Sequence, residues 1–229
     1  MAALPILLGL VPGFAWLFFF MQEDEDGEPK YLIAFTFLAG IAFSFFALVV
    51  QIFLRSTFKG FGIGQTAILS LIIFALIEEI FKFAAAYYSV HRDPAFDVPV
   101  DAMIYMVVAA MGFATVENLA IAAGGALQNA AFFDSVFQTL SARFVGATLL
   151  HALTSGIVGY YWAVSILRLR QGRYLIWGFV LATGLHAFFN WLIITYGNVV
   201  FPILFVGTIG FFVLNDFEKL AQDRVNFRD

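Results

Sequence analysis

The stretch LIEEIFKFAAAY, Leu76–Tyr87, places two adjacent glutamates and a lysine inside a long apolar run that extends from about residue 63 to 90. A run of this length can cross a membrane as a helix. An ionisable side chain at that depth is costly unless it is paired or faces a polar cavity. The stretch therefore predicts a membrane helix whose neighbours supply partners for Glu78, Glu79 and Lys82.

The composition of the whole chain agrees with a membrane bundle. Of the 229 residues, 62% are hydrophobic and 12% are charged, whereas soluble domains carry about 25% charged residues. The N-terminal run lacks a basic segment before it and is expected to be retained as a span rather than removed as a signal peptide. The predicted fold is all-α, a polytopic transmembrane helical bundle in one domain, 1–229. Its seven expected spans are about 3–21, 31–54, 63–90, 101–123, 144–167, 174–196 and 199–215.

The basic residues predict the orientation of the bundle in the cell membrane. Cytoplasmic loops are enriched in lysine and arginine. With seven spans, one side of the membrane carries eight basic residues: Lys30, Arg92, Arg168, Arg170, Arg173, Lys219, Arg224 and Arg228. The opposite side carries Arg55, Lys59 and Arg143. The C-terminus is therefore expected in the cytoplasm and the N-terminus outside.

Two features exclude classes of partner. The net charge of −4 argues against nucleic acid. The absence of cysteine excludes disulfides and cysteine-ligated metals.

The segment AAGGALQNAAFFDSVFQTLSAR, residues 122–143, resists a simple assignment. It is too polar to span with ease and too apolar for an ordinary loop. An amphipathic helix on the outer surface is the first expectation. A segment that dips back into the protein, where irregular backbone is tolerated, is the alternative.

The predicted spans contribute almost nothing else that is ionisable outside a small set, whose spacing is informative: Glu117 and Asn118, His151, and His186 with Asn190. Glu78 and Lys82 lie four residues apart and are expected to pair, while Glu79 points about 100° away, toward a different cavity. Each polar residue alone could be a packing bridge or a hydrogen-bond partner between helices. Together they are too costly to be unrelated, which predicts one polar cavity open to the outer side.

Four motifs occur in order on consecutive predicted spans: EEIFK (Glu78–Lys82), GFATVEN (Gly112–Asn118), HALTSGIVGYYW (His151–Trp162) and HAFFN (His186–Asn190). They resemble those of the PrsW family of bacterial intramembrane proteases, which is related to the CAAX prenyl proteases and the bacteriocin-processing membrane proteases. The resemblance implies an intramembrane endopeptidase with a motif-bearing core of about 63–196. It also implies membrane-anchored protein substrates, such as anti-sigma factors, cleaved near the outer membrane surface. The CAAX proteases have a histidine where this chain has Glu117, so their mechanism does not transfer atom for atom.

Two mechanisms fit these residues. In the first, Glu78 or Glu79 is the general base, His151 orients the water, and His186 and Asn190 donate hydrogen bonds to the oxyanion.

In the second mechanism, Glu117, His151 and His186 hold a zinc ion that keeps an open position for water, and the glutamate pair supplies the base. Lys82 and Asn118 support the site in either mechanism.

Two functions without proteolysis remain as alternatives. A proton-coupled transporter could use the same carboxylates and histidines as a relay, but no inverted repeat is visible in the sequence. A non-catalytic scaffold of the same fold would be expected to have lost part of the glutamate and histidine set, which is complete here.

Overall fold

The structure, a computed structural model, describes residues 3–22, 27–126, 132–168 and 172–225. These residues form α-helices and one π-helical turn, with no strand among them, which confirms the predicted all-α class. The helices are α1 (Ala3–Met21), α2 (Lys30–Gly60), α3 (Ile68–Val90), α4 (Pro99–Ala126), α5 (Phe132–Arg143), the π-helical turn (Phe144–Thr148), α6 (Leu149–Leu167), α7 (Arg173–Tyr196) and α8 (Val200–Val225).

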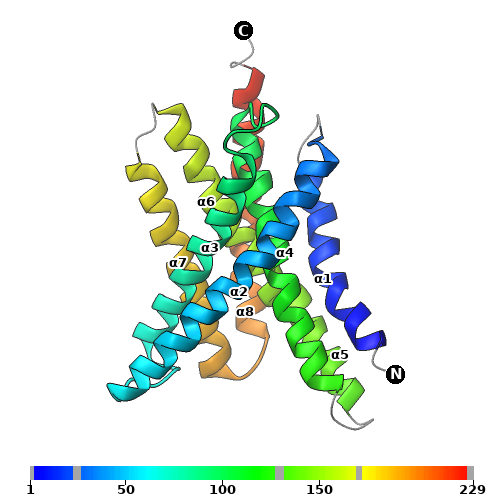
Figure 1. Ribbon diagram of the computed structural model, residues 1–229, viewed down its shortest axis with the longest axis vertical. Coiled ribbons are helices and arrows are strands. Elements are labelled where there is room, and N and C mark those ends of the chain that lie inside the picture. The colour runs from blue at the N-terminus through cyan, green and yellow to red at the C-terminus, as the bar shows by residue number, and fades with distance from the viewer. Residues whose placement is uncertain (1–2, 23–26, 127–131, 169–171, 226–229) are drawn as a thin grey trace.

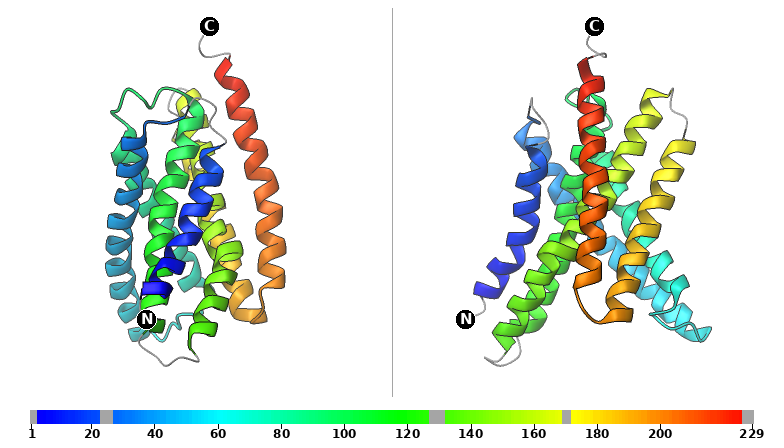
Figure 2. Two further views of the ribbon diagram at one scale, coloured as in Figure 1. Left: turned by 90° about the vertical axis from the view of Figure 1, so that its right-hand side faces the viewer. Right: turned by 180° about the vertical axis from the view of Figure 1, so that it is seen from behind.

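Successive segments of the chain run in alternating directions through the bundle. α1 starts at the lower end in Figure 1 and α8 finishes at the upper end (Figures 1 and 2). Five helical stretches are long and apolar enough to cross a membrane by length and composition: Lys30–Gly60, Pro99–Ala123, Phe137–Leu167, Arg173–Tyr196 and Val200–Leu220. The other two predicted spans are also helical. Ile6–Met21 forms a shorter apolar helix, and α3 carries the three ionisable residues of the opening stretch.

Helix α4 lies at the centre of the bundle and packs against α1, α2, α3 and α6. It is buried over most of its length, as expected of a helix that is apolar on all sides. Glycines let α2 and α4 approach each other closely. A Cβ added at Gly40 of α2 would overlap the carbonyl of Ala109 of α4, and one added at Gly112 of α4 would overlap the carbonyl of Phe37 of α2. Small residues at helix crossings are typical of membrane proteins. This tight crossing fixes the polar end of α4 relative to α2 and α3.

The outer surfaces of α2, α7 and α8 are covered by large apolar side chains. Exposed examples are Phe45, Phe53, Trp177, Phe211 and Phe212. A soluble monomer rarely exposes such extended apolar surface, so these faces are suited to contact with lipid.

The described part of the segment 122–143 comprises the end of α4 and the helix α5, and its position relative to the membrane surface stays a prediction. α5, the π-helical turn and α6 follow one another without a break, and Phe137–Leu167 is one of the candidate spans. α5 packs against α1 and α4 rather than lying apart on a surface. Residues 127–131 lie outside the described part of the chain. Arg143, the charge at the end of α5, donates hydrogen bonds to Glu117 and Asn118 of α4.

Candidate active site

The motif residues of four helices meet in one network of contacts. α3 brings Glu78, Glu79 and Lys82, α4 brings Glu117 and Asn118, α6 brings His151, and α7 brings His186. Asn190 of α7 lies beside the network and makes no hydrogen bond to the residues that the structure describes, but it lines the same cavity as Glu78. Motifs that are far apart in sequence are therefore close in space.

Glu79 is the buried hub of the network. Its Oε1 atom accepts hydrogen bonds from Lys82 Nζ at 2.6 Å and Thr154 Oγ1 at 3.0 Å, and it lies 2.8 Å from His186 Nδ1. The side chains of Glu79 and Lys82 are both fully buried. A carboxylate held by three donors away from solvent is fixed in place and is poorly placed to meet a water molecule.

The predicted pairing of Lys82 with Glu78 is wrong. Lys82 forms its ion pair with Glu79, three residues before it. Both spacings put the two side chains on one face of a helix, so periodicity does not distinguish them. Neighbouring helices decide, because Lys82 Nζ also lies 3.2 Å from His151 Nδ1 on α6.

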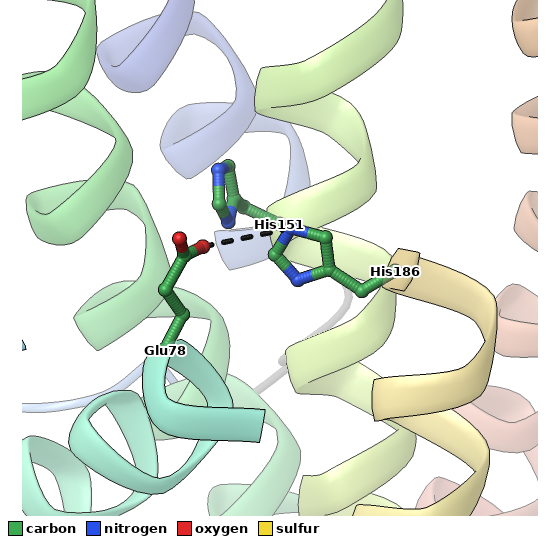
Figure 3. Close-up of side chains that lie close together, drawn as sticks. All are labelled: Glu78, His151 and His186. Atoms are coloured by element: carbon green, nitrogen blue, oxygen red, sulfur yellow. Dashed lines mark ion pairs between the residues drawn. The ribbon is translucent and has the colours of Figure 1, made fainter. Parts of the chain in front are cut away.

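Glu78 has the opposite environment from its neighbour. Its side chain is 15% exposed, and its Oε2 atom lies 3.5 Å from His186 Nε2 (Figure 3). Gln51 of α2 donates a hydrogen bond to its Oε1 atom at 2.9 Å. Glu78 and Asn190 also line a cavity of about 250 Å³, called here the Glu78 cavity. Of the two adjacent glutamates, Glu78 is the one that water or a peptide can reach.

The partners of His186 assign its hydrogen. The Glu79 carboxylate can only accept, so Nδ1 of His186 donates to it and Nε2 carries the lone pair. That lone pair faces Glu78 Oε2, which is also an acceptor when ionised. Two acceptors facing each other at this distance require a proton or a cation between them. The pair is therefore arranged to share a proton or to bind a metal ion.

His151 is held at both ring nitrogens. Its Nδ1 atom faces Lys82 Nζ, and its Nε2 atom lies 3.2 Å from Glu117 Oε2. An ammonium can only donate and a carboxylate can only accept, so Nδ1 accepts and Nε2 donates. The ring stands perpendicular to that of His186, with 5.1 Å between the centroids.

Arg143 was interpreted from sequence only as an outer-side charge, and the structure gives it a place in the network. Its Nη2 atom donates to Glu117 Oε2 at 2.8 Å and its Nε atom to Asn118 Oδ1 at 2.6 Å. Asn118 in turn donates to Thr148 Oγ1 at 3.1 Å. Arg143 therefore fixes the carboxylate that holds His151.

The sequence analysis also passed over Gln51 and Thr154. Gln51 is a buried polar residue within the apolar span of α2, and that isolation is a signal that could have identified it. Thr154 follows His151 by three residues and so shares its helical face. Helical spacing could have identified it as well.

A group of three donors could hold a metal ion. Glu78, His151 and His186 each offer one ligand atom, and these atoms lie within 4.8 Å of one another (Figure 3). The predicted set had Glu117 in the place of Glu78. Glu117 is not part of this group, and its carboxylate is engaged by Arg143 and His151.

The residues fit a metal ion in type and in separation. Two histidines and one glutamate form a known catalytic zinc set. His186 donates through Nδ1 to a carboxylate, the usual way in which a metal-binding histidine is held. In order to bind through Nε2, His151 would have to lose the Nε2 hydrogen that it donates to Glu117 and carry its ring hydrogen on Nδ1, which would also end its hydrogen bond from Lys82.

Comparisons with known proteins found a matching family and several relatives. Residues 28–215 match the family described as PrsW family intramembrane metalloprotease. The Protease PrsW of Geobacillus kaustophilus is 30% identical over 192 residues, which cover 82% of this chain and 79% of that protein. The Protease PrsW of Bacillus subtilis is 25% identical over 205 residues, 87% of each chain. That of Oceanobacillus iheyensis is 26% identical over 186 residues, 81% of this chain and 80% of the relative. No solved structure matches the chain.

Proposed function

Because the chain belongs to the PrsW family of intramembrane proteases, we propose that it hydrolyses a peptide bond in membrane-anchored proteins, such as anti-sigma factors, near the outer surface of the cell membrane. The observation that carries the proposal is the difference between the environments of the two adjacent glutamates. Glu79 is locked by three donors, whereas Glu78 lines a cavity together with Asn190.

The outward position of the reaction is supported by the place of the Glu78 cavity in the bundle. The cavity is also lined by Gln65, in the connection between α2 and α3, and by Ile194, near the end of α7. These connections lie at the end of the bundle that carries few basic residues. The positive-inside rule puts that end outside and the C-terminus in the cytoplasm.

In the proposed reaction, Glu78 takes a proton from the attacking water as general base. The side-chain amide of Asn190 donates a hydrogen bond to the oxyanion that develops on the substrate carbonyl. His186 Nε2 receives the proton from Glu78 and delivers it to the leaving amine as the C–N bond breaks. Glu79 holds the Nδ1 hydrogen of His186 and stabilises the ring while it is charged, as the carboxylate of a catalytic triad does.

Glu78, His151 and His186 are the residues that would hold a metal ion. When bound, such an ion would polarise the substrate carbonyl and make a bound water more acidic. Glu78 and His186 Nε2 would then serve as ligands and would not carry the proton, while Asn190 and the hydrogen bond from His186 Nδ1 to Glu79 would keep their places.

The test is cleavage of a purified single-span protein by the purified enzyme in detergent, with and without a chelator. We expect a single mapped cleavage site in the outer part of the substrate span. Glu78→Gln should abolish cleavage, and Asn190→Ala should lower kcat by about 100- to 1,000-fold, the cost of losing one oxyanion donor. Loss of cleavage with the chelator, restored by zinc, would support the metal.

The contrary outcomes are equally clear. A wild-type protein that cleaves no single-span substrate would favour the non-catalytic scaffold. Glu78→Gln with normal activity would exclude the assigned base and ligand. Proton flux through wild-type liposomes that Glu78→Gln abolishes would favour the transporter.

A further inference from the structure

Arg55 of α2 is a cation at the Glu78 cavity. It is the one basic residue in the lining. Its guanidinium lies over the ring of Phe74, 5.3 Å from the centroid. Arg55 forms no hydrogen bond or ion pair with the part of the chain that the structure describes. The stacked ring positions the guanidinium and leaves its hydrogen-bond donors free.

The distance of Arg55 from the reacting groups follows from helix geometry. Gln51 of α2 contacts both Glu78 and the carbonyl of Phe74. Arg55 lies one turn beyond Gln51 on α2, and Phe74 lies one turn before Glu78 on α3. One turn of four residues corresponds to about 6 Å along the helix axis. The cation is therefore about one turn nearer the outer end than the Glu78 carboxylate.

That offset corresponds to a definite register of an extended substrate. A peptide strand advances about 3.3 Å per residue, and alternate side chains point to the same side. A substrate bound with its scissile carbonyl at Glu78 would present to Arg55 the side chain about two residues away on the outer side.

We propose that Arg55 forms a substrate subsite for a carboxylate side chain, aspartate or glutamate, about two residues from the scissile bond on its outer side. This inference rests on the proposed proteolysis and adds a substrate class to it. A guanidinium matches a carboxylate through two parallel hydrogen bonds. Without Arg55, an acidic side chain here would meet only the negative charge of Glu78, so this one residue decides whether the cavity accepts or rejects an acid.

The competing role for Arg55 is contact with lipid phosphate at the membrane surface, which arginines near helix ends commonly make. The two roles differ in what they affect. A lipid contact influences every substrate equally, whereas a subsite influences only substrates that differ at the position it reads.

The experiment uses a purified single-span test protein in which the sequence of the outer segment is varied. The cleavage site is mapped by mass spectrometry, and Glu, Gln or Lys is then placed at each of the first four positions outward from it. We expect the wild-type enzyme to prefer Glu over Gln by about tenfold in kcat/KM at the second position, the size of a charge-assisted hydrogen bond. Arg55→Gln should bring this ratio to about one, and Arg55→Glu should favour Lys.

Lys59→Gln is the matched control. Lys59 lies one turn beyond Arg55 on the same helix, is exposed and is not part of the cavity lining. The variant removes the same charge and should keep the preference for Glu. A preference that Arg55→Gln leaves unchanged, or a loss of activity that is equal for all substrates, would overturn the subsite while leaving proteolysis intact.

A binding measurement separates this inference from the proposed function. Fluorescence polarisation measures the binding of labelled peptides with the sequences of these outer segments to the Glu78→Gln enzyme, and this measurement needs no cleavage. We expect the Glu segment to bind more tightly than the Gln segment, and the difference to vanish in Glu78→Gln/Arg55→Gln. Equal affinity of Glu78→Gln for both segments would refute the subsite even if proteolysis itself were established.

Discussion

Replacing Glu79 with glutamine should lower the stability of the protein much more than replacing Glu78 with glutamine. Glu79 and Lys82 are fully buried and 2.6 Å apart. Removing one partner of a buried ion pair leaves an uncompensated charge and costs about 3–5 kcal/mol. For a chain of this length, that loss corresponds to a fall in melting temperature on the order of 10 °C.

Glu78→Gln should behave differently. The side chain is partly exposed, and a glutamine oxygen can still accept the hydrogen bond from Gln51. We expect its stability to stay within about 0.5–1 kcal/mol of wild type. Both variants should lose cleavage, Glu78→Gln through loss of the base and Glu79→Gln through displacement of His186.

The double variant Glu79→Gln/Lys82→Met provides the control. It removes both charges, and an apolar replacement for a buried pair is often neutral or stabilising. Its melting temperature should therefore recover most of the loss, although activity should not return. The measurement is thermal unfolding in detergent, followed by tryptophan fluorescence. If Glu79→Gln melts like wild type, or if Glu78→Gln is the less stable of the two, the assignment of the locked and the accessible glutamate is wrong.

Two further predictions concern the helix crossing and the orientation. Gly112→Ala should destabilise the protein by about 1–3 kcal/mol in the same unfolding assay, because the new Cβ would overlap a carbonyl of α2. Gly64→Ala is its control, because a Cβ at Gly64 would meet open space. Equal stability of the two variants would contradict the close crossing. Because the chain has no native cysteine, Asn198→Cys should react with an impermeant maleimide added to intact cells, and Gly172→Cys should react only after lysis. The reverse labelling pattern would overturn the orientation.

The sequence by itself determined the fold class and indicated most of the ionisable residues that lie together in the network. Long apolar runs can satisfy their backbone groups in a membrane only as helices or closed barrels. The length of the runs, about 20 residues each, selects helices. Within such helices, ionisable residues are so costly that their presence alone identifies them as related. This is why the carboxylates and imidazoles of four motifs could be expected to lie together; in the structure they form one network of contacts, and of these groups only Glu78 lines the Glu78 cavity.

The tertiary structure decided what each member contacts. Glu78 and Glu79 are chemically identical neighbours, and helical spacing permits Lys82 to pair with either. Glu79 becomes the locked carboxylate because Thr154 and His186 approach it from α6 and α7. Contacts between helices depend on crossing angles and side-chain packing, which the period of one helix does not contain.

The same limit explains the residues that the sequence analysis did not find. Gln51 and Thr154 carry weak signals within their own helices, whereas Arg143 carries none; the partner of each lies on another helix, and only the packing of helices shows that contact. The metal group predicted from sequence contained Glu117, whereas the structure has Glu78 in its place. This difference has the same origin, because the ion pair between Arg143 of α5 and Glu117 of α4 was not visible in the sequence. The cost of burying charge determined which residues belong to the site, and the packing of helices determined which of them touch.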